Sequence, residues 1–150
     1  MKNLVLSFGF ILTALVGLSQ SNKVDVESIG NQWQNYFENS QIKIQVKKEN
    51  CSFPQEGIHQ QFLLFKYQNK LAQAIIIDLH NDFYYNSQCS TCGVDEYNYS
   101  FTVDPNSSLE ATCDLLAPGY KTVFVKQTNM NTSSELTSVE LTDIKVEEEQ

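Results

Sequence analysis

The chain has 150 residues, with 18 acidic and 10 basic side chains and a formal net charge of −8. All ten basic residues are lysine. Because bidentate recognition of phosphate and of guanine normally uses arginine, this composition argues against nucleic acid and anionic lipid as partners. The length suits one domain with a substantial core.

The first residues have the pattern of a secretory signal. Lys2 is followed by an uncharged apolar run over residues 4–18, and Gly17 and Ser19 are small residues at the −3 and −1 positions of a cleavage site. The run is shorter than the roughly 20 residues of a membrane span. We predict a signal peptide over residues 1–19, export to the periplasm or beyond, and no membrane insertion after cleavage. An uncleaved anchor is the alternative.

A polar stretch over residues 20–31 predicts a flexible lead-in to a single β-sandwich domain at residues 32–150. Residues 32–37 contain three aromatic side chains and precede a turn-like Glu-Asn-Ser sequence, which favours a short strand. A single short helix is the alternative, because helical spacing also groups the three aromatic residues.

The clearest strand is predicted at residues 41–48, where isoleucine and valine alternate with lysine and glutamine. Residues 60–79 predict a hairpin around a turn at residues 68–70. Both arms contain continuous apolar runs, which indicate central strands or a sheet face extended by neighbouring loops.

A long loop, residues 80–96, separates this hairpin from the next strand. An Asp-Pro-Asn-Ser sequence then predicts a turn, and Pro118-Gly119 predicts a further break. In the last strand the apolar positions change phase, which predicts a β-bulge near Thr142-Asp143. The strands after the loop are predicted at residues 97–103, 109–113, 120–127 and 135–146.

Six to eight short strands, with no convincing long helix between them, predict an antiparallel β-sandwich of about seven strands rather than a βαβ architecture. The pattern QFLLFKYQNK…AIIIDL, YSFTVDPNSSLEATC, KTVFVKQTN and LTSVELTDIKV resembles immunoglobulin-like β-sandwich domains of small secreted proteins of Bacteroidetes-type bacteria. The resemblance covers roughly residues 40–147 and implies a fold but no activity. The chain lacks the buried Cys…Trp…Cys spacing of antibody domains.

The even number of cysteines and the predicted export favour two disulfides. We expect a local Cys89–Cys92 bridge and a long bridge from Cys51 to Cys113, although crossed pairings remain open. Successive loops of an antiparallel sandwich alternate between its two ends. This counting predicts that all four cysteines, His59 and His80 lie at one end.

Two other roles for the cysteines are possible. The four thiols could bind a structural zinc ion, or Cys89 and Cys92 could form a redox-active dithiol. Redox-active Cys-x-x-Cys motifs usually open a helix, and Gly93 with the following strand leaves no room for one. Loop acids at Asp82, Asp95, Glu96 and Asp114 could bind calcium, although their spacing matches no EF-hand. Solvation of these acids is the simpler reading, so no metal, cofactor or catalytic residue is predicted.

Phe83, Tyr84 and Tyr85 are the predicted binding residues, because aromatic side chains in a long loop can stack on a sugar or anchor a protein partner. The alternative is that they cover the end of the core. The predicted function is a secreted or periplasmic, non-catalytic domain with a binding or structural role in the cell envelope and an unknown protein or glycan partner. The alternative is a thiol–disulfide oxidoreductase, or a zinc-binding protein, that uses Cys89 and Cys92.

Overall fold

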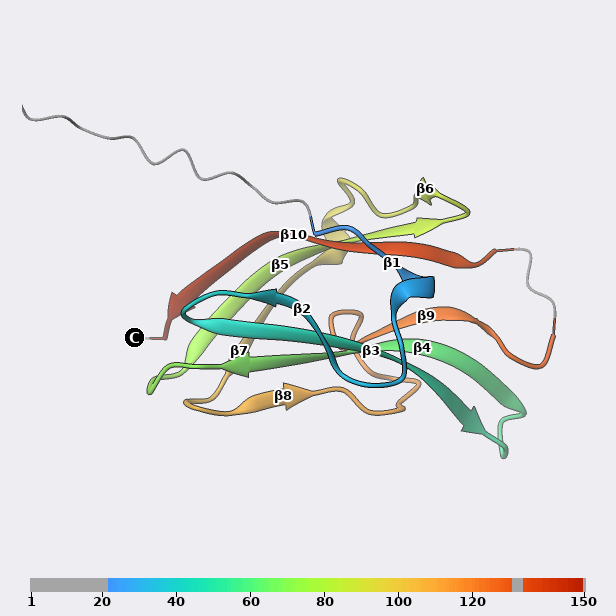
Figure 1. The fold of residues 1–150 in the computed structure, drawn as a ribbon, viewed down its shortest axis with the longest axis horizontal. Helices are drawn as coiled ribbons and strands as arrows, with labels where there is room; N and C mark the ends of the chain where they lie inside the picture. Colours follow the sequence, from blue (N-terminus) through green and yellow to red (C-terminus); the bar gives the residue numbers. More distant parts are fainter. Residues whose placement is uncertain (1–21, 131–133, 150) are drawn as a thin grey trace, which may run out of the picture.

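In the computed structural model, residues 22–130 and 134–149 are described, and two antiparallel β-sheets face each other across a hydrophobic core (Figure 1). No α-helix occurs in these residues, which contain only strands and two short 3₁₀ turns, η1 (Val26–Ser28) and η2 (Asp95–Tyr97). The antiparallel β-sandwich is thereby confirmed. The predicted signal peptide, residues 1–19, lies outside the described residues.

The first sheet, called here the β5 sheet, is built around two long strands, β5 (Ile75–Tyr85) and β10 (Leu136–Glu148). β1 (Val24–Asp25) pairs with the outer edge of β10. The other edge of β5 pairs with β7 (Asn98–Val103) along its first half and with β6 (Gln88–Cys89) at its end. β5 therefore forms the centre of this sheet.

The second sheet, called here the β4 sheet, has the order β2 (Gln34–Glu38), β3 (Ile42–Phe53) and β4 (Ile58–Asn69). The free edge of β4 pairs with two segments, β8 (Ser108–Glu110) and β9 (Thr122–Gln127), and both run antiparallel to it. These two segments are pieces of one edge line. The residues between them, 111–121, leave the sheet and return to it, and are called here the excursion.

The predicted return strand through Cys113 is therefore wrong, because β8 ends at Glu110 and the chain does not reverse at Pro118. The ten strand segments exceed the predicted seven partly for this reason. β2, β3 and β4 follow one another in one sheet, whereas the constant-type immunoglobulin order places the third strand opposite the first two. The confirmed part of the fold prediction is the two-layer antiparallel architecture.

The alternation predicted for residues 41–48 is confirmed, since Ile42, Ile44 and Val46 are fully buried between the sheets. The continuous apolar run in β4 is explained by burial on both faces of the strand. Leu64 points away from the main core, yet it is buried in a smaller cluster with Phe62, Cys51 and Ala111. The excursion begins at Ala111, so a neighbouring loop covers this second face of β4. Such a loop was one of the two explanations that the apolar runs allowed.

The lead-in prediction is wrong for the residues that follow Asn22. Val26 is 3% exposed and Ile29 is 1% exposed, and both belong to the main core. Val24 pairs with Val139 in β10. The domain therefore begins before residue 32, because three apolar side chains in a polar stretch are enough to anchor it to the sandwich.

The strand prediction for residues 32–37 is confirmed by β2. Its Tyr36 is buried, donates a hydrogen bond of 2.6 Å to the Asn22 carbonyl and accepts one of 2.7 Å from the Leu141 N–H. The predicted bulge in β10 is also confirmed, because its pairing with β5 shifts between Thr142 and Lys145 and Asp143 has a φ of 52°.

Candidate functional site

β5 extends six residues further than predicted and includes His80 to Tyr85. These residues pair with β10 as far as Leu136, so the predicted loop at residues 80–96 begins only after Tyr85. Asn86 and Ser87 both have positive φ, 48° and 65°, as the two central residues of a type I′ hairpin turn do. The turn leads into β6, which lies against the end of β5.

Strand alternation separates the three predicted binding aromatics. Phe83 is 6% exposed in the main core, where its ring meets that of Tyr97 at 5.6 Å. Tyr85 also packs against the core and donates a hydrogen bond to the Phe124 carbonyl at 3.1 Å. Only Tyr84 lies on the outer face of the β5 sheet. The description of all three as loop aromatics is therefore wrong, and their role in binding stays a prediction.

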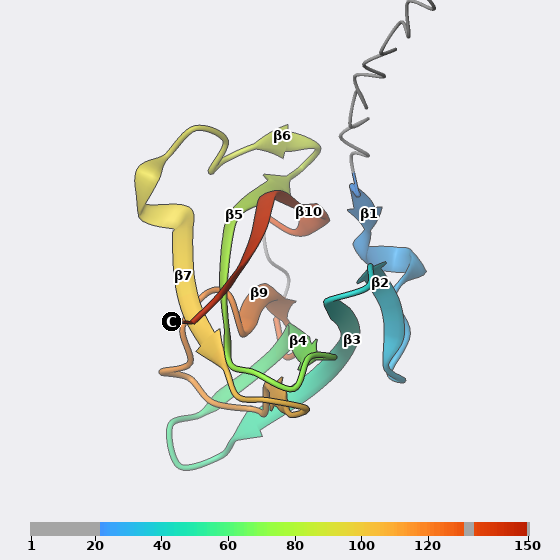
Figure 2. The same ribbon diagram turned by 90° about the vertical axis from the view of Figure 1, so that its left-hand side faces the viewer.

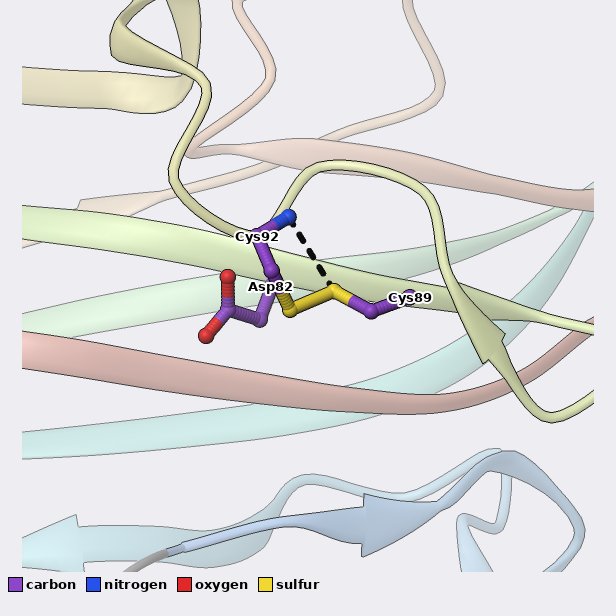
Figure 3. Close-up of side chains that lie close together, drawn as sticks. All are labelled: Asp82, Cys89 and Cys92. Atoms are coloured by element: carbon purple, nitrogen blue, oxygen red, sulfur yellow. Dashed lines mark hydrogen bonds between the residues drawn. A yellow bond between two sulfur atoms is a disulfide. The ribbon is translucent and has the colours of Figure 1, made fainter.

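Both expected disulfides are present, Cys51–Cys113 and Cys89–Cys92. The first joins β3 to the excursion within the small apolar cluster of the β4 sheet. The second lies over the outer face of the β5 sheet, beside Asp82 (Figure 3). Because the two bridges lie on different sheets, the four cysteines cannot share one zinc ion.

The prediction that the four cysteines and both histidines lie at one end assumed that the chain reverses at residues 114–119. This assumption is wrong, because β8 and β9 run in the same direction, both antiparallel to β4. Cys113 nevertheless reaches Cys51, because the excursion carries it there. His59 contacts Ser52 at 3.2 Å, whereas His80 lies in the middle of β5.

The corner formed by Asp82, Cys89 and Cys92 is the candidate site. A carboxylate oxygen of Asp82 and the two Sγ atoms all lie within 4.8 Å of one another (Figure 3). Within the described residues, this is the only set of three potential metal ligands that close together. Cys92 is exposed, Cys89 is half-buried, and the Cys92 N–H donates a hydrogen bond to Cys89 Sγ at 3.0 Å.

The loop that carries the disulfide is fixed to β5 by Thr91, which is buried. Its hydroxyl donates to the Asn81 carbonyl and accepts from the Phe83 N–H, both at 2.7 Å. These bonds satisfy backbone groups of β5 that no neighbouring strand reaches. A threonine between two cysteines was the sequence signal for this docking, and it was missed.

Asp82 is 9% exposed and lies 3.1 Å from His80 Nε2. The same nitrogen contacts the Thr91 carbonyl at 3.2 Å, and His80 Nδ1 contacts Asn98 Oδ1 at 2.8 Å. Although His80 Nε2 lies this close, Asp82 Oδ1 is buried and takes part in no hydrogen bond. A buried carboxylate oxygen in this condition is costly and marks a candidate binding position.

Tyr84 connects the disulfide to the neighbouring strand. Its hydroxyl lies 3.8 Å from Cys92 Sγ and donates to Glu140 at 3.2 Å, and Lys23 Nζ lies 3.3 Å above its ring. Desolvation raises the pKa of Tyr84, followed by the hydrogen bond to Glu140 and by negative charge nearby. The face is therefore rich in acidic groups around one aromatic ring.

The four acids considered as an alternative calcium site do not gather in one place. Asp82 and Asp95 line a hollow of about 380 Å³ together with Asp143, but Glu96 and Asp114 do not reach it. Of the acids in the hollow, only Asp82 belongs to the close set of potential ligands, and its partners there are Cys89 and Cys92.

No helix that the structure describes is both long and apolar enough to cross a membrane. Comparison with known proteins gives no matching family model, no matching curated protein and no matching solved structure.

Proposed function

We propose that the protein is an exported, non-catalytic binding domain, and that its binding surface is the outer face of the β5 sheet around Tyr84. The observation that carries this proposal is the position of Tyr84, an outward-facing aromatic ring on the central strand of a sheet, beside a loop closed by a disulfide. Tyrosine is enriched among the residues that dominate binding energy, because it buries a large apolar area and keeps a polar end.

The rigidity of this surface supports the proposal. β5 pairs with β10 along one edge and with β7 and β6 along parts of the other, Thr91 holds the loop to the residues between these two strands, and the Cys89–Cys92 bridge closes the loop. Binding to such a surface orders few additional groups, so little of the interaction energy is lost to conformational entropy.

The charges around Tyr84 indicate what kind of partner fits. Glu140 accepts from its hydroxyl and Asp82 lies close by, while the ammonium of Lys23 lies over the ring. A protein side chain with a positive charge could take the position of Lys23, and a sugar ring could stack there through its C–H groups. Export is supported by the two disulfides, which form and persist in oxidising compartments.

A pull-down with the immobilised protein from envelope and secreted fractions tests the proposal. Tyr84→Ala should weaken retention of the captured partner by about 30-fold, the loss of roughly 2 kcal/mol typical of a dominant contact. Tyr84→Phe is the matched variant, which keeps the ring and loses the hydroxyl. Leu116→Ala, at a 91% exposed position on the excursion, is the control on the other sheet. Full retention by Tyr84→Ala together with loss of retention by Leu116→Ala would place the binding surface on the excursion and would contradict the proposal.

A second candidate is thiol–disulfide exchange at Cys89–Cys92, favoured by the exposure of Cys92. Activated dithiols normally have a helix N-terminus or a neighbouring cation, and here the adjacent ionisable group is the Asp82 carboxyl. An insulin-reduction assay tests this activity. Turnover that disappears in Cys89→Ser would replace the binding proposal with an enzymatic one.

A further inference from the structure

Three features of the Asp82 corner are not explained by a binding surface alone. The Asp82 side chain is 12% exposed, its Oδ1 accepts no hydrogen bond although His80 Nε2 lies 3.1 Å away, and a carboxylate oxygen lies within 4.8 Å of two sulfur atoms. As long as the sulfurs are bonded to each other, they neither donate a hydrogen bond to the carboxylate nor act as thiolate ligands beside it. Once they are reduced, the same three groups become a set of metal ligands.

We propose that reduction of the Cys89–Cys92 disulfide converts this corner into a binding site for a thiophilic divalent cation such as Zn²⁺, held by both Sγ atoms and one Asp82 oxygen. Cysteine sulfur and carboxylate oxygen are both ordinary zinc ligands. Zn–S bonds of about 2.3 Å place two sulfurs of a tetrahedral site nearly 4 Å apart. The present spacing therefore requires only a local adjustment after the sulfurs separate.

The fourth coordination position is open to water, because no other described His, Cys, Asp or Glu side chain joins this close set. His80 acts behind the ligands. Its Nε2 lies 3.1 Å from Asp82 Oδ1, and its other nitrogen is held by Asn98. In the metal-bound state a hydrogen bond from this nitrogen to Asp82 would orient the carboxylate, as hydrogen-bonded partners behind metal ligands do.

Charge balance favours a cation in the reduced state. Two thiolates and the Asp82 carboxylate bring three negative charges together, and the described residues provide no helix N-terminus to offset them. A divalent cation neutralises two of these charges. Metal capture therefore suits the dithiol better than the redox turnover considered above.

The chemistry needs an external dithiol as reductant. Two electrons and two protons pass from the dithiol to the protein, so the S–S bond of Cys89–Cys92 breaks and the S–S bond of the oxidised dithiol forms. The metal then binds to the two thiols and displaces their two protons into water. The Cys51–Cys113 bridge must stay oxidised in this step; Cys51 is 2% exposed but Cys113 is open to solvent like Cys92, so peptide mapping after alkylation has to place the two free thiols on Cys89 and Cys92.

Titration with Co²⁺, a spectroscopic substitute for Zn²⁺, tests the site in the purified protein. After mild reduction, alkylation and mass measurement should count two free thiols. That species should bind one Co²⁺ with a thiolate-to-metal charge-transfer absorption, and Zn²⁺ should displace it. The oxidised protein should show no such absorption. A folded, reduced protein that gives none in excess Co²⁺ overturns the proposal.

Variants identify the ligands. Asp82→Asn should weaken binding at least about tenfold, whereas Glu140→Gln, which changes the carboxyl directly across the strand pair, should alter it less than about threefold. Equal affinity in Asp82→Asn, or in Cys89→Ser/Cys92→Ser, contradicts the ligand set. X-ray absorption of the zinc form of the unaltered chain is a check that needs no variant. It should count two sulfurs and two lighter atoms, and a different sulfur count contradicts the site. None of these results depends on finding the partner of Tyr84.

Discussion

Replacing Cys51 and Cys113 by alanine should destabilise the domain by about 4 kcal/mol. The bridge closes a loop of 62 residues, and the loop-closure entropy removed from the unfolded chain gives about this value at 25 °C. Cys89–Cys92 closes only three residues, for which the same relation gives less than about 2 kcal/mol. Alanine is preferred to serine, because a hydroxyl at the buried Cys51 would add a separate cost.

Urea unfolding followed by the fluorescence of Trp33, the single tryptophan, measures both variants. Trp33 packs against the small cluster that contains Cys51, so it reports on the region that changes. The m-value of the Cys51→Ala/Cys113→Ala variant should also rise, because its unfolded chain exposes more surface. Equal losses in the two double variants would refute the loop-closure reasoning, and so would a loss below about 2 kcal/mol for the long bridge.

Three smaller changes test other parts of the fold. Asn69→Ala should cost at least about 2 kcal/mol in the same urea assay, since its side chain is buried and donates to three backbone carbonyls; a neutral result contradicts this. Asp143→Gly should raise the melting temperature slightly, because glycine adopts the φ of 52° without strain; a lower one shows that the side chain matters more than the backbone. Burial raises the pKa of Tyr36, so its stabilising contribution is complete below about pH 10 and is lost as the pH rises above it. The unfolding free energy, measured from about pH 9 to about pH 12, should fall less steeply in Tyr36→Phe than in the unaltered protein. Parallel curves would contradict this.

Local patterns predicted much of the fold. Alternation identified β3, the change of phase located the bulge at Asp143, and the Cys-x-x-Cys spacing suggested the Cys89–Cys92 disulfide. Each of these signals lies within a few residues of the feature it predicts. They succeed because side-chain period and turn chemistry are local properties of a strand.

The errors arise where contacts with other segments of the chain decide the structure. His80 and Asp82 looked like loop residues because they are polar, but Thr91 and the disulfide loop cover them on the outer face of a central strand. β8 and β9 looked like two strands around a turn because Pro118 interrupts them, although both pair with β4. Residues 24–29 looked unstructured because only Val26 and Ile29 in this stretch are core residues, which is too few to show a strand or helix period. The partner of His80 lies 11 residues away, whereas in the other two cases the strand that decides the structure lies much further along the chain.

The place of β10 between β1 and β5 has a consequence for how the chain acquires its structure (Figure 2). β1 begins the described part of the chain and β10 nearly ends it, so β1 has no strand to pair with until the last strand is available. Until then, the full length of β5 also lacks a neighbour on one side. The β3–β4 hairpin can form early from nearby residues, whereas the pairing of β5 with β10 needs a contact of about 60 residues' separation, which is slow to form. Loss of the C-terminal strand should therefore leave β1 without a pairing strand and reduce the sheet to β5, β6 and β7, with a long exposed edge on β5 that invites self-association.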